Sequence, residues 1–184
     1  ARFPVYGRLS QLDQRELRSG ASGRVSSDEY AKEDARDFVL WKAAQPDDEA
    51  VKAAWDAPFG RGRPGWHLEC SAMALDLIGK QLGTDVLDIH AGGIDLVFPH
   101  HEDEIAQSCA HTGKADFARV WMHGEFLTMA GTKMSKRFGN ILTARDLREE
   151  KVDAGTVRLL LATTQYRAPL DFTDQERLLL DVLD

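Results

Sequence analysis

The chain has 184 residues, a length that suits about one domain and is sufficient for a sizeable core. Hydrophobic residues make up 43% and charged residues 29%, and these ordinary globular values exclude a disordered, collagen-like or coiled-coil chain. The formal net charge is −7, so bulk charge does not hold the chain to nucleic acid and any such contact must be local.

Cysteine content and hydropathy indicate the cellular setting. Two cysteines, Cys70 and Cys109, cannot form a disulfide framework, and we expect a reducing, cytoplasmic setting. The longest apolar runs are far shorter than the roughly 20 residues that a membrane-spanning helix needs. The N-terminus has neither a starting Met nor a signal-peptide core, and we expect it to be a cut inside a longer protein.

The N-terminal third carries few signals of regular structure. Residues 1–35 are polar and rich in Gly, Ser and charge, which indicates a surface connection or insertion. Asp37–Lys42 is an apolar run of strand length. Gln45–Pro64 contains three prolines and predicts a turn-rich linker, where we place the first boundary.

After Gly65 the apolar spacing predicts the order helix, strand, helix, strand, which favours a parallel α/β unit. These elements are expected at residues 66–82, 86–89, 100–112 and 120–129. Gly83 and Gly113 follow the two helices where a helix is expected to end, and Pro99 stands at the start of the second. Three further helices are expected at residues 143–151, 154–165 and 173–184.

Cys70 and the run from His100 to Glu104 form the first candidate site. His100 and Glu104 stand at i and i+4, so both project from one face of the same predicted helix. A thiolate, an imidazole and a carboxylate suit Zn²⁺, and three protein ligands leave a position open for a substrate. Alternatively, Cys70 is a small buried hydrophobe and the acidic run complements the helix dipole. Nothing local brings Cys70 to His100, so both interpretations stay open.

The second candidate site is the basic segment Lys133–Arg137, between Gly131 and Gly139. It carries three cations within five residues, and the flanking glycines predict a mobile loop that closes over phosphates. Lysines aimed at a transferring or departing phosphate would stabilise the charge that grows in the transition state. The alternative is a solvated basic loop without a ligand.

The third candidate is the segment Asp88–Asp95, a strand that runs into a Gly-Gly turn. At the carboxyl end of a parallel strand, close backbone approach and a carboxylate suit a ribose or phosphate. An ordinary strand–helix connection is the alternative. Trp66 either lines a pocket or belongs to the core. Three histidines, His67, His111 and His123, have no recognisable partner and are expected to be structural or exposed.

In this order, the segments resemble cysteinyl-tRNA synthetase, a class I aminoacyl-tRNA synthetase. The stretches that carry the resemblance are Tyr6–Ser10, Asp37–Lys42, Gly62–Met73, Phe98–Gln107, Lys133–Lys136 and Tyr166–Phe172. The resemblance implies an α/β fold, namely the second half of a Rossmann-like parallel-sheet catalytic domain followed by helices of the stem-contact region. Its implied parts are the end of a connective insertion with its linker (1–58), the second half of the catalytic domain (59–128), and the signature loop with the start of the stem-contact region (129–184).

The resemblance implies a metal site and a reason for it. The family's catalytic zinc is held by two cysteines, a histidine and a glutamate, and three of these match Cys70, His100 and Glu104. The zinc recognises cysteine by binding its thiolate, because the hydroxyl of serine is a far poorer ligand. A pocket based on size alone would separate these near-isosteres poorly.

The resemblance also assigns residues around the two small substrates. Trp66 matches the indole that lines the cysteine pocket, and His90 matches a polar residue beside the aminoacyl group. The residues assigned to ATP belong to the class I turn and to the signature loop, namely Gly92, Gly93, Asp95 and Lys136. Lys133 and Lys136 are the expected catalytic groups, since the loop stabilises the triphosphate during adenylate formation.

Three departures from the family pattern accompany the resemblance. The first zinc cysteine and the His-Ile-Gly-His signature lie upstream in the family and do not occur here. The signature loop has Arg137 where the family has Ser, which keeps both lysines and adds a cation. The family's anticodon-binding region would follow Asp184. With half an ATP site and three of four ligands, we expect no aminoacylation by the chain alone.

For the whole enzyme, the resemblance implies that cysteine is activated with ATP and Mg²⁺ to cysteinyl-adenylate and transferred to the 3′ end of tRNA(Cys). One zinc ion per subunit, a monomer, a cytoplasmic location and no membrane partner are the accompanying expectations. A rival is the cysteine ligase of mycothiol biosynthesis, which gives cysteine to an amino-sugar inositol; Glu104 and His90 favour the synthetase. A second rival is a non-catalytic relic that binds a metal or a partner.

Overall fold

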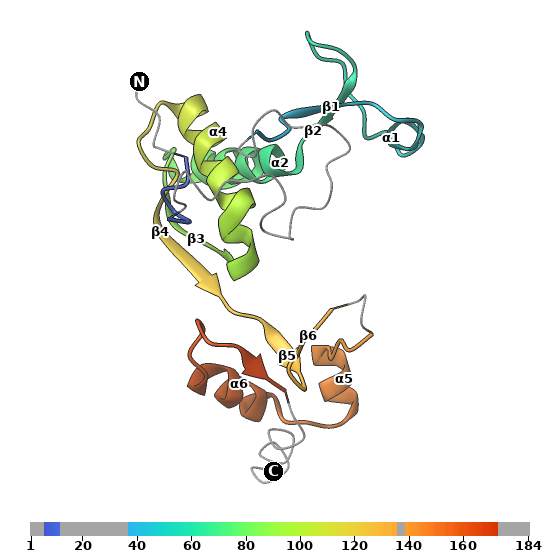
Figure 1. Ribbon diagram of the computed structural model, residues 1–184, viewed down its shortest axis with the longest axis vertical. Helices are drawn as coiled ribbons and strands as arrows, with labels where there is room; N and C mark the ends of the chain where they lie inside the picture. Colours follow the sequence, from blue (N-terminus) through green and yellow to red (C-terminus); the bar gives the residue numbers. More distant parts are fainter. Residues whose placement is uncertain (1–5, 12–36, 136–138, 173–184) are drawn as a thin grey trace. The chain divides into compact units, whose positions relative to one another are not determined.

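The computed structural model describes residues 6–11, 37–135 and 139–172 (Figure 1). The chain divides into two compact units. Unit 1 comprises residues 1–90 and 95–121, and unit 2 comprises residues 91–94 and 122–184. Both units contain helices and strands, which confirms the α/β class. None of the helices in the described ranges is long and apolar enough to cross a membrane.

Unit 1 begins with a small hairpin-like pair of strands. Strand β1 (Trp41–Ala43) pairs antiparallel with β2 (Gly62–Pro64), and helix α1 (Pro46–Ala50) lies between them in the chain. The predicted turn-rich linker over residues 45–64 therefore also contains two short regular elements, α1 and β2. Pro46 opens α1, where a fixed φ and a missing N–H favour the first helical turn. The prolines and glycines were interpreted as breakers, but here they mark the ends of short elements.

The predicted helix over residues 66–82 has the expected extent. It consists of α2 (Trp66–Met73), the π-helical turn η1 (Ala74–Gly79) and α3 (Lys80–Leu82). Gly83 ends it in the left-handed conformation, with φ +64°, which glycine adopts without steric cost. The π-helical middle could not be predicted, because it changes the hydrogen-bond register and not the composition.

Strand, helix and strand follow as expected in the rest of unit 1. Strand β3 (Leu87–Gly93) is longer than predicted, and the turns η2 (Ile94–Leu96) and η3 (Val97–His101) lead from it into α4 (Glu102–Thr112). Strand β4 (Ala118–Gly124) lies beside β3 in a two-stranded sheet. The buried core between these elements consists of Leu87, Ile105, Cys109, Phe117 and Ala118. The division between the units runs through β3 and β4.

Unit 2 is built around a three-stranded sheet. Strand β5 (Leu127–Met129) is central, antiparallel to β6 (Thr132–Lys133) and parallel to β7 (Leu170–Asp171). A single strand over residues 120–129 is thus a wrong prediction: β4 ends at Gly124, and the next amide, at Glu125, donates to the carbonyl of Tyr166 at 2.8 Å.

Two of the three predicted C-terminal helices are present. Helix α5 (Ala144–Glu149) begins after Thr143, and α6 (Ala154–Thr163) begins after Asp153. Both preceding side chains accept a hydrogen bond from the first-turn amide three residues on, which stabilises each helix start. The third expected helix, at residues 173–184, lies outside the described residues.

Candidate functional site

The structure brings together the three residues predicted to bind a metal. Cys70 lies on α2, His100 at the end of η3 and Glu104 in the first turn of α4. One potential ligand atom from each lies within 4.8 Å of the other two. His100 and Glu104 are buried, and Cys70 is half-buried. The meeting of Cys70 with His100, which the spacing left open, results from the packing of α2 against α4 (Figure 1).

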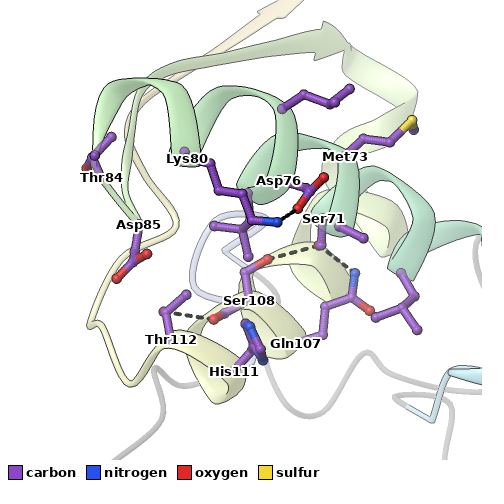
Figure 2. A pocket seen from close by; sticks show the side chains of 16 residues that line it. Ser71, Met73, Asp76, Lys80, Thr84, Asp85, Gln107, Ser108, His111 and Thr112 are labelled. Carbon is purple, nitrogen blue, oxygen red and sulfur yellow. Dashed lines mark hydrogen bonds and ion pairs between the residues drawn. The ribbon is translucent and has the colours of Figure 1, made fainter.

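Polar side chains fasten these two helices to each other. Gln107 of α4 donates through Nε2 to Ser71 Oγ at 2.6 Å, and Ser108 Oγ donates to the same oxygen at 2.9 Å (Figure 2). Gln107 Nε2 also donates to the carbonyl of His67 at 2.5 Å. Ser71 directly follows Cys70, so these bonds set the position of the thiol relative to α4.

Burial determines the protonation of the two neutral ligand candidates. It raises the pKa of the Cys70 thiol, and the nearby carboxylates of Glu104 and Glu69 raise it further. It lowers the pKa of His100, with Glu104 opposing this effect and His90 adding to it. The metal-free site therefore holds a thiol and a neutral imidazole at pH 7. The imidazole is already in its ligand form, whereas the thiol must release a proton when a metal binds.

Glu104 is the residue whose environment points most directly to a cation. Its Oε2 accepts from His90 Nε2 at 2.9 Å and lies 3.8 Å from Nε2 of both His100 and His101. Its Oε1 is buried and has no hydrogen-bond partner among the described residues. A buried carboxylate oxygen without a partner is costly, and a bound cation would remove that cost. The sulfur, nitrogen and oxygen donors fit zinc.

A second trio of donors shares the same carboxylate. His90, His101 and Glu104 also place one ligand atom each within 4.8 Å of one another. The sequence analysis placed His101 within the candidate run but did not assign it as a ligand, although it lies three residues before Glu104 and so on the same helical face. This trio lacks sulfur, whereas the first trio offers the thiolate that favours zinc.

An aromatic wall stands beside the donors. The Trp66 ring lies 4.3 Å from the His100 ring, centroid to centroid, and 57% of Trp66 is exposed, so it is not a core residue. The His90 ring lies 4.7 Å from that of Trp121 and 4.8 Å from that of His101. Trp66 therefore presents an open apolar face next to His100.

The sequence analysis missed a row of polar contacts behind His100. His67, expected to be structural or exposed, places Nδ1 2.6 Å from His100 Nδ1 and Nε2 3.2 Å from Asp103 Oδ2. The hydroxyl of Tyr6 donates to the other oxygen of Asp103. One signal could have found His67: it precedes Cys70 by three residues on α2 and therefore shares its face.

The residues assigned to ATP lie in both units. Gly92 and Gly93 end β3, and Asp95 lies in η2. Lys133 ends β6, and its Nζ stands 3.7 Å from the centroid of the Phe126 ring. Lys136 lies outside the described residues.

Asn140 joins the two described ends of the signature loop. Its Oδ1 accepts from the Ser135 amide at 2.9 Å, and its Nδ2 donates to the Lys133 carbonyl at 3.2 Å. These bonds hold the base of the loop closed.

A cavity of about 1000 Å³ opens elsewhere in unit 1. Its walls come from α2, η1, α3 and α4 (Figure 2). None of the residues predicted to bind metal, cysteine or ATP lines it. The metal donors therefore lie outside this cavity.

Comparison with known proteins defines the class. The family model for the tRNA synthetases class I (C) catalytic domain matches residues 1–181. The chain belongs to this family of class I synthetase catalytic domains, as its sequence motifs indicated.

Individual relatives carry a more specific name. The chain is 54% identical over 174 residues to the Cysteine–tRNA ligase of Chlamydia pneumoniae, covering 95% of this chain and 35% of that protein. It is 51% identical over 176 residues to the Cysteine–tRNA ligase of Trichodesmium erythraeum, covering 94% and 34%. The chain thus spans about a third of the length of these curated relatives.

A solved LeuRS–tRNA–LeuAMS complex from Agrobacterium radiobacter is a weaker match. It shares 17% identity over 78% of this chain and 22% of that chain, with a TM-score of 0.49.

Proposed function

We propose that the chain supplies part of the active site of a cysteine–tRNA ligase. The complete enzyme would activate cysteine with ATP and Mg²⁺ to cysteinyl-adenylate and transfer the cysteine to the 3′ end of tRNA(Cys). The observation that carries the proposal is the convergence of Cys70, His100 and Glu104 on one point. The relatives named Cysteine–tRNA ligase support it.

Cys70, His100 and Glu104 would hold one zinc ion. When bound, zinc would supply a Lewis acid for which the thiolate of cysteine is a far better ligand than the hydroxyl of serine. Cys109, the other cysteine, lies in the hydrophobic core and is not assigned to the site. The family's first zinc cysteine is thus expected from outside this chain.

The surrounding side chains would select and orient the amino acid. Trp66 offers an open apolar face against the body of the substrate, and His90 holds Glu104 through a hydrogen bond. Because Glu104 is held from one side, its second oxygen keeps a defined direction. This fixed geometry lets binding energy position the carboxylate of cysteine for attack on ATP.

The nucleotide would be bound by residues of two segments. Gly92 and Gly93 permit close backbone approach, and Asp95 supplies a carboxylate beside them. Lys133 and Lys136 would neutralise the charge that develops on the triphosphate as pyrophosphate departs. The chemistry then rests on positioning and electrostatics, and no covalent enzyme intermediate is needed.

Transfer of labelled cysteine to tRNA by the full-length protein tests the proposal, with serine in a parallel reaction. We expect charging with cysteine and none with serine. Activation of cysteine without labelled tRNA would overturn the ligase and favour transfer to an amino-sugar inositol. No activation at all would leave a non-catalytic binding relic. The monomeric state and the cytoplasmic location stay predictions.

A further inference from the structure

We propose that Tyr6, Asp103 and His67 form a relay that fixes the ring orientation and the tautomer of His100. The inference rests on the proposed zinc site and deepens it. It makes these three side chains positioning residues, since they act on the metal through His100. None of them belongs to the predicted ligand set.

The relay determines which nitrogen of His100 faces the metal. His100 Nδ1 lies 2.6 Å from His67 Nδ1, so that nitrogen is already engaged. The other nitrogen, Nε2, lies 3.8 Å from Glu104 Oε2. Nε2 is therefore the ligand atom of His100, and the ring is held from behind, as metal-bound imidazoles usually are.

Proton accounting then assigns the tautomers along the row. A metal-binding Nε2 must offer its lone pair, so neutral His100 carries its proton on Nδ1 and donates it to His67 Nδ1. His67 then carries its own proton on Nε2. That nitrogen lies 3.2 Å from Asp103 Oδ2, at an ion-pair distance without hydrogen-bond geometry, and the adjacent negative charge favours a proton on Nε2. Reversing the position of the proton at either contact, His100–His67 or His67–Asp103, would place a proton on Nε2 of His100, the metal-binding atom.

Asp103 can play this part because it is held in place on its other side. The residue is completely buried, and its second oxygen accepts from the hydroxyl of Tyr6. One carboxylate oxygen of Asp103 therefore accepts from Tyr6, and the other lies next to His67. Gln107 of α4 holds His67 as well, because its Nε2 donates to the backbone carbonyl of His67 at 2.5 Å.

Tyr6 comes from a segment remote in sequence, and Glu102 secures that segment. The two carboxylate oxygens of Glu102 accept from the amides of Gly7, at 3.0 Å, and Ser10, at 2.7 Å. The Ser10 hydroxyl adds a third bond at 3.0 Å. Segment 6–11 is thereby fixed to the start of α4, directly beside the residue that Tyr6 contacts.

Zinc affinity of the full-length protein tests the relay, with Asp103→Asn as the first variant. The amide keeps the shape of the carboxylate but cannot present two acceptor oxygens. We expect zinc to bind about 10- to 100-fold more weakly, the range typical of groups that orient a metal ligand. Tyr6→Phe removes one hydroxyl and should weaken binding by a smaller factor. Competition with a chromophoric chelator measures both.

A second readout reports geometry independently of activity. Cobalt(II) substituted for zinc has a visible spectrum that depends on ligand geometry, and we expect it to change in Asp103→Asn. Asp56→Asn is the matched control, because Asp56 is exposed and pairs with Arg61 at the surface. It should leave affinity and spectrum unchanged.

The outcomes separate the relay from the zinc site itself. Unchanged zinc affinity and cobalt spectrum in both Asp103→Asn and Tyr6→Phe would overturn the relay while the zinc site stood. A wild-type protein that binds no zinc would overturn the zinc site and the relay together. Should Asp103→Asn fail to fold, Tyr6→Phe decides, because it deletes a single oxygen and leaves the ring contact with Phe98.

Discussion

Glu104 concentrates the chemistry of the site in one side chain. It faces His90, His100 and His101, and it retains a buried oxygen without a hydrogen-bond partner among the described residues. A nearby positive charge stabilises a buried carboxylate more than it stabilises a solvated one. The consequences of changing it should therefore be larger than those of changing any of its supporting neighbours.

Glu104→Gln should abolish tight zinc binding and cysteine selection. The amide keeps the volume but removes the charge, and loss of a ligand should exceed the roughly 10- to 100-fold effect typical of supporting groups. We expect kcat/KM for cysteine in ATP–pyrophosphate exchange to fall by at least about 100-fold, with zinc content falling in parallel. Glu69→Gln, at an exposed carboxylate next to Cys70, should retain both. Equal losses in the two variants would refute a specific role for Glu104.

Zinc affinity should rise with pH because of Cys70. Burial raises the pKa of its thiol, so the proton is still bound at neutral pH and must leave when zinc binds. His100 releases none, since its pKa is lowered. Below the thiol pKa, the apparent affinity should gain about tenfold per pH unit for each proton released.

The slope of log affinity against pH isolates this thiol. In Cys70→Ser we expect the slope between pH 6.5 and 8, roughly the range in which the thiol stays protonated, to fall by about one. Metal-buffered titrations of wild type and variant at matched ionic strength measure it. An unchanged slope would show that Cys70 does not release a proton to the site.

At this scale the sequence selected three candidate donors that lie close together in the structure, but it did not predict the side chains that surround them. Residue chemistry was enough to select Cys70, His100 and Glu104 as a possible set. The partnership of His67 with Asp103 and Tyr6 could not be predicted, because it depends on where segment 6–11 meets α4. Histidine and aspartate are also common at surfaces, so neither residue type alone indicates a buried contact.

Among the elements, α2 and α4 are the pair that builds the site. Ser71 and Ser108 are buried where the helices meet, and Gln107 bonds to the first of them (Figure 2). Buried hydroxyls at a helix contact are stabilising only while each has a partner. The interface should therefore be sensitive to loss of a single oxygen.

Ser71→Ala should destabilise the full-length protein by about 1–3 kcal/mol, because it leaves donors from Gln107 and Ser108 without an acceptor. Chemical denaturation measures the free energy of unfolding. Thr163→Ala is the control: its exposed hydroxyl bonds to carbonyls of its own helix, so it should change stability by less than about 0.5 kcal/mol. If Ser71→Ala lowered the free energy of unfolding no more than Thr163→Ala does, the hydrogen bonds of Ser71 would not stabilise the contact between α2 and α4.

Glu102→Gln should loosen segment 6–11 from α4. Hydrogen bonds to a charged acceptor are worth about 1.5–3 kcal/mol, so amide exchange at Gly7 and Ser10 should accelerate by roughly 10- to 100-fold. Hydrogen–deuterium exchange with mass spectrometry of the full-length protein measures it. Glu149→Gln, at an exposed position on α5, should leave the exchange of this segment unchanged. If the amides of Gly7 and Ser10 exchanged as slowly in Glu102→Gln as in wild type, Glu102 would not be what holds segment 6–11 to α4.

Element prediction succeeded where periodicity and a terminating glycine agreed. Helices over 66–82 and 100–112 end at Gly83 and Gly113, both in the left-handed conformation. It failed over 45–64, where α1 has only one and a half turns and too few residues for a period to emerge. It also merged β4 with β5, because an extended chain continues the alternation through the break at residues 125–126.

At the scale of the whole molecule, the chain holds the candidate metal donors in unit 1 and Lys133 in unit 2. The family's His-Ile-Gly-His signature and its first zinc cysteine do not occur in the chain. The chain spans about a third of its curated relatives. We therefore expect the complete reaction to require groups that this chain does not carry.

The isolated chain should not charge tRNA with cysteine. Catalysis by positioning requires both the amino acid and the nucleotide to be held, and we expect this chain to supply only part of the nucleotide site. We expect aminoacylation at the level of a no-enzyme blank, beside full activity of the complete protein. Turnover above the blank would show that the residues described above are sufficient.

The first turn of α4 restricts the insertions and deletions that the protein can accept. Glu102, Asp103 and Glu104 are adjacent but have different partners. Glu102 accepts hydrogen bonds from segment 6–11, Asp103 lies beside His67, and Glu104 lies beside the candidate metal ligands. Successive helical residues are rotated by about 100°, so inserting or deleting one residue just before Glu102 would turn every carboxylate toward its neighbour's partner. Related sequences should therefore vary here by exchange of side chains at constant length, with gains and losses of residues confined to the loops outside this turn.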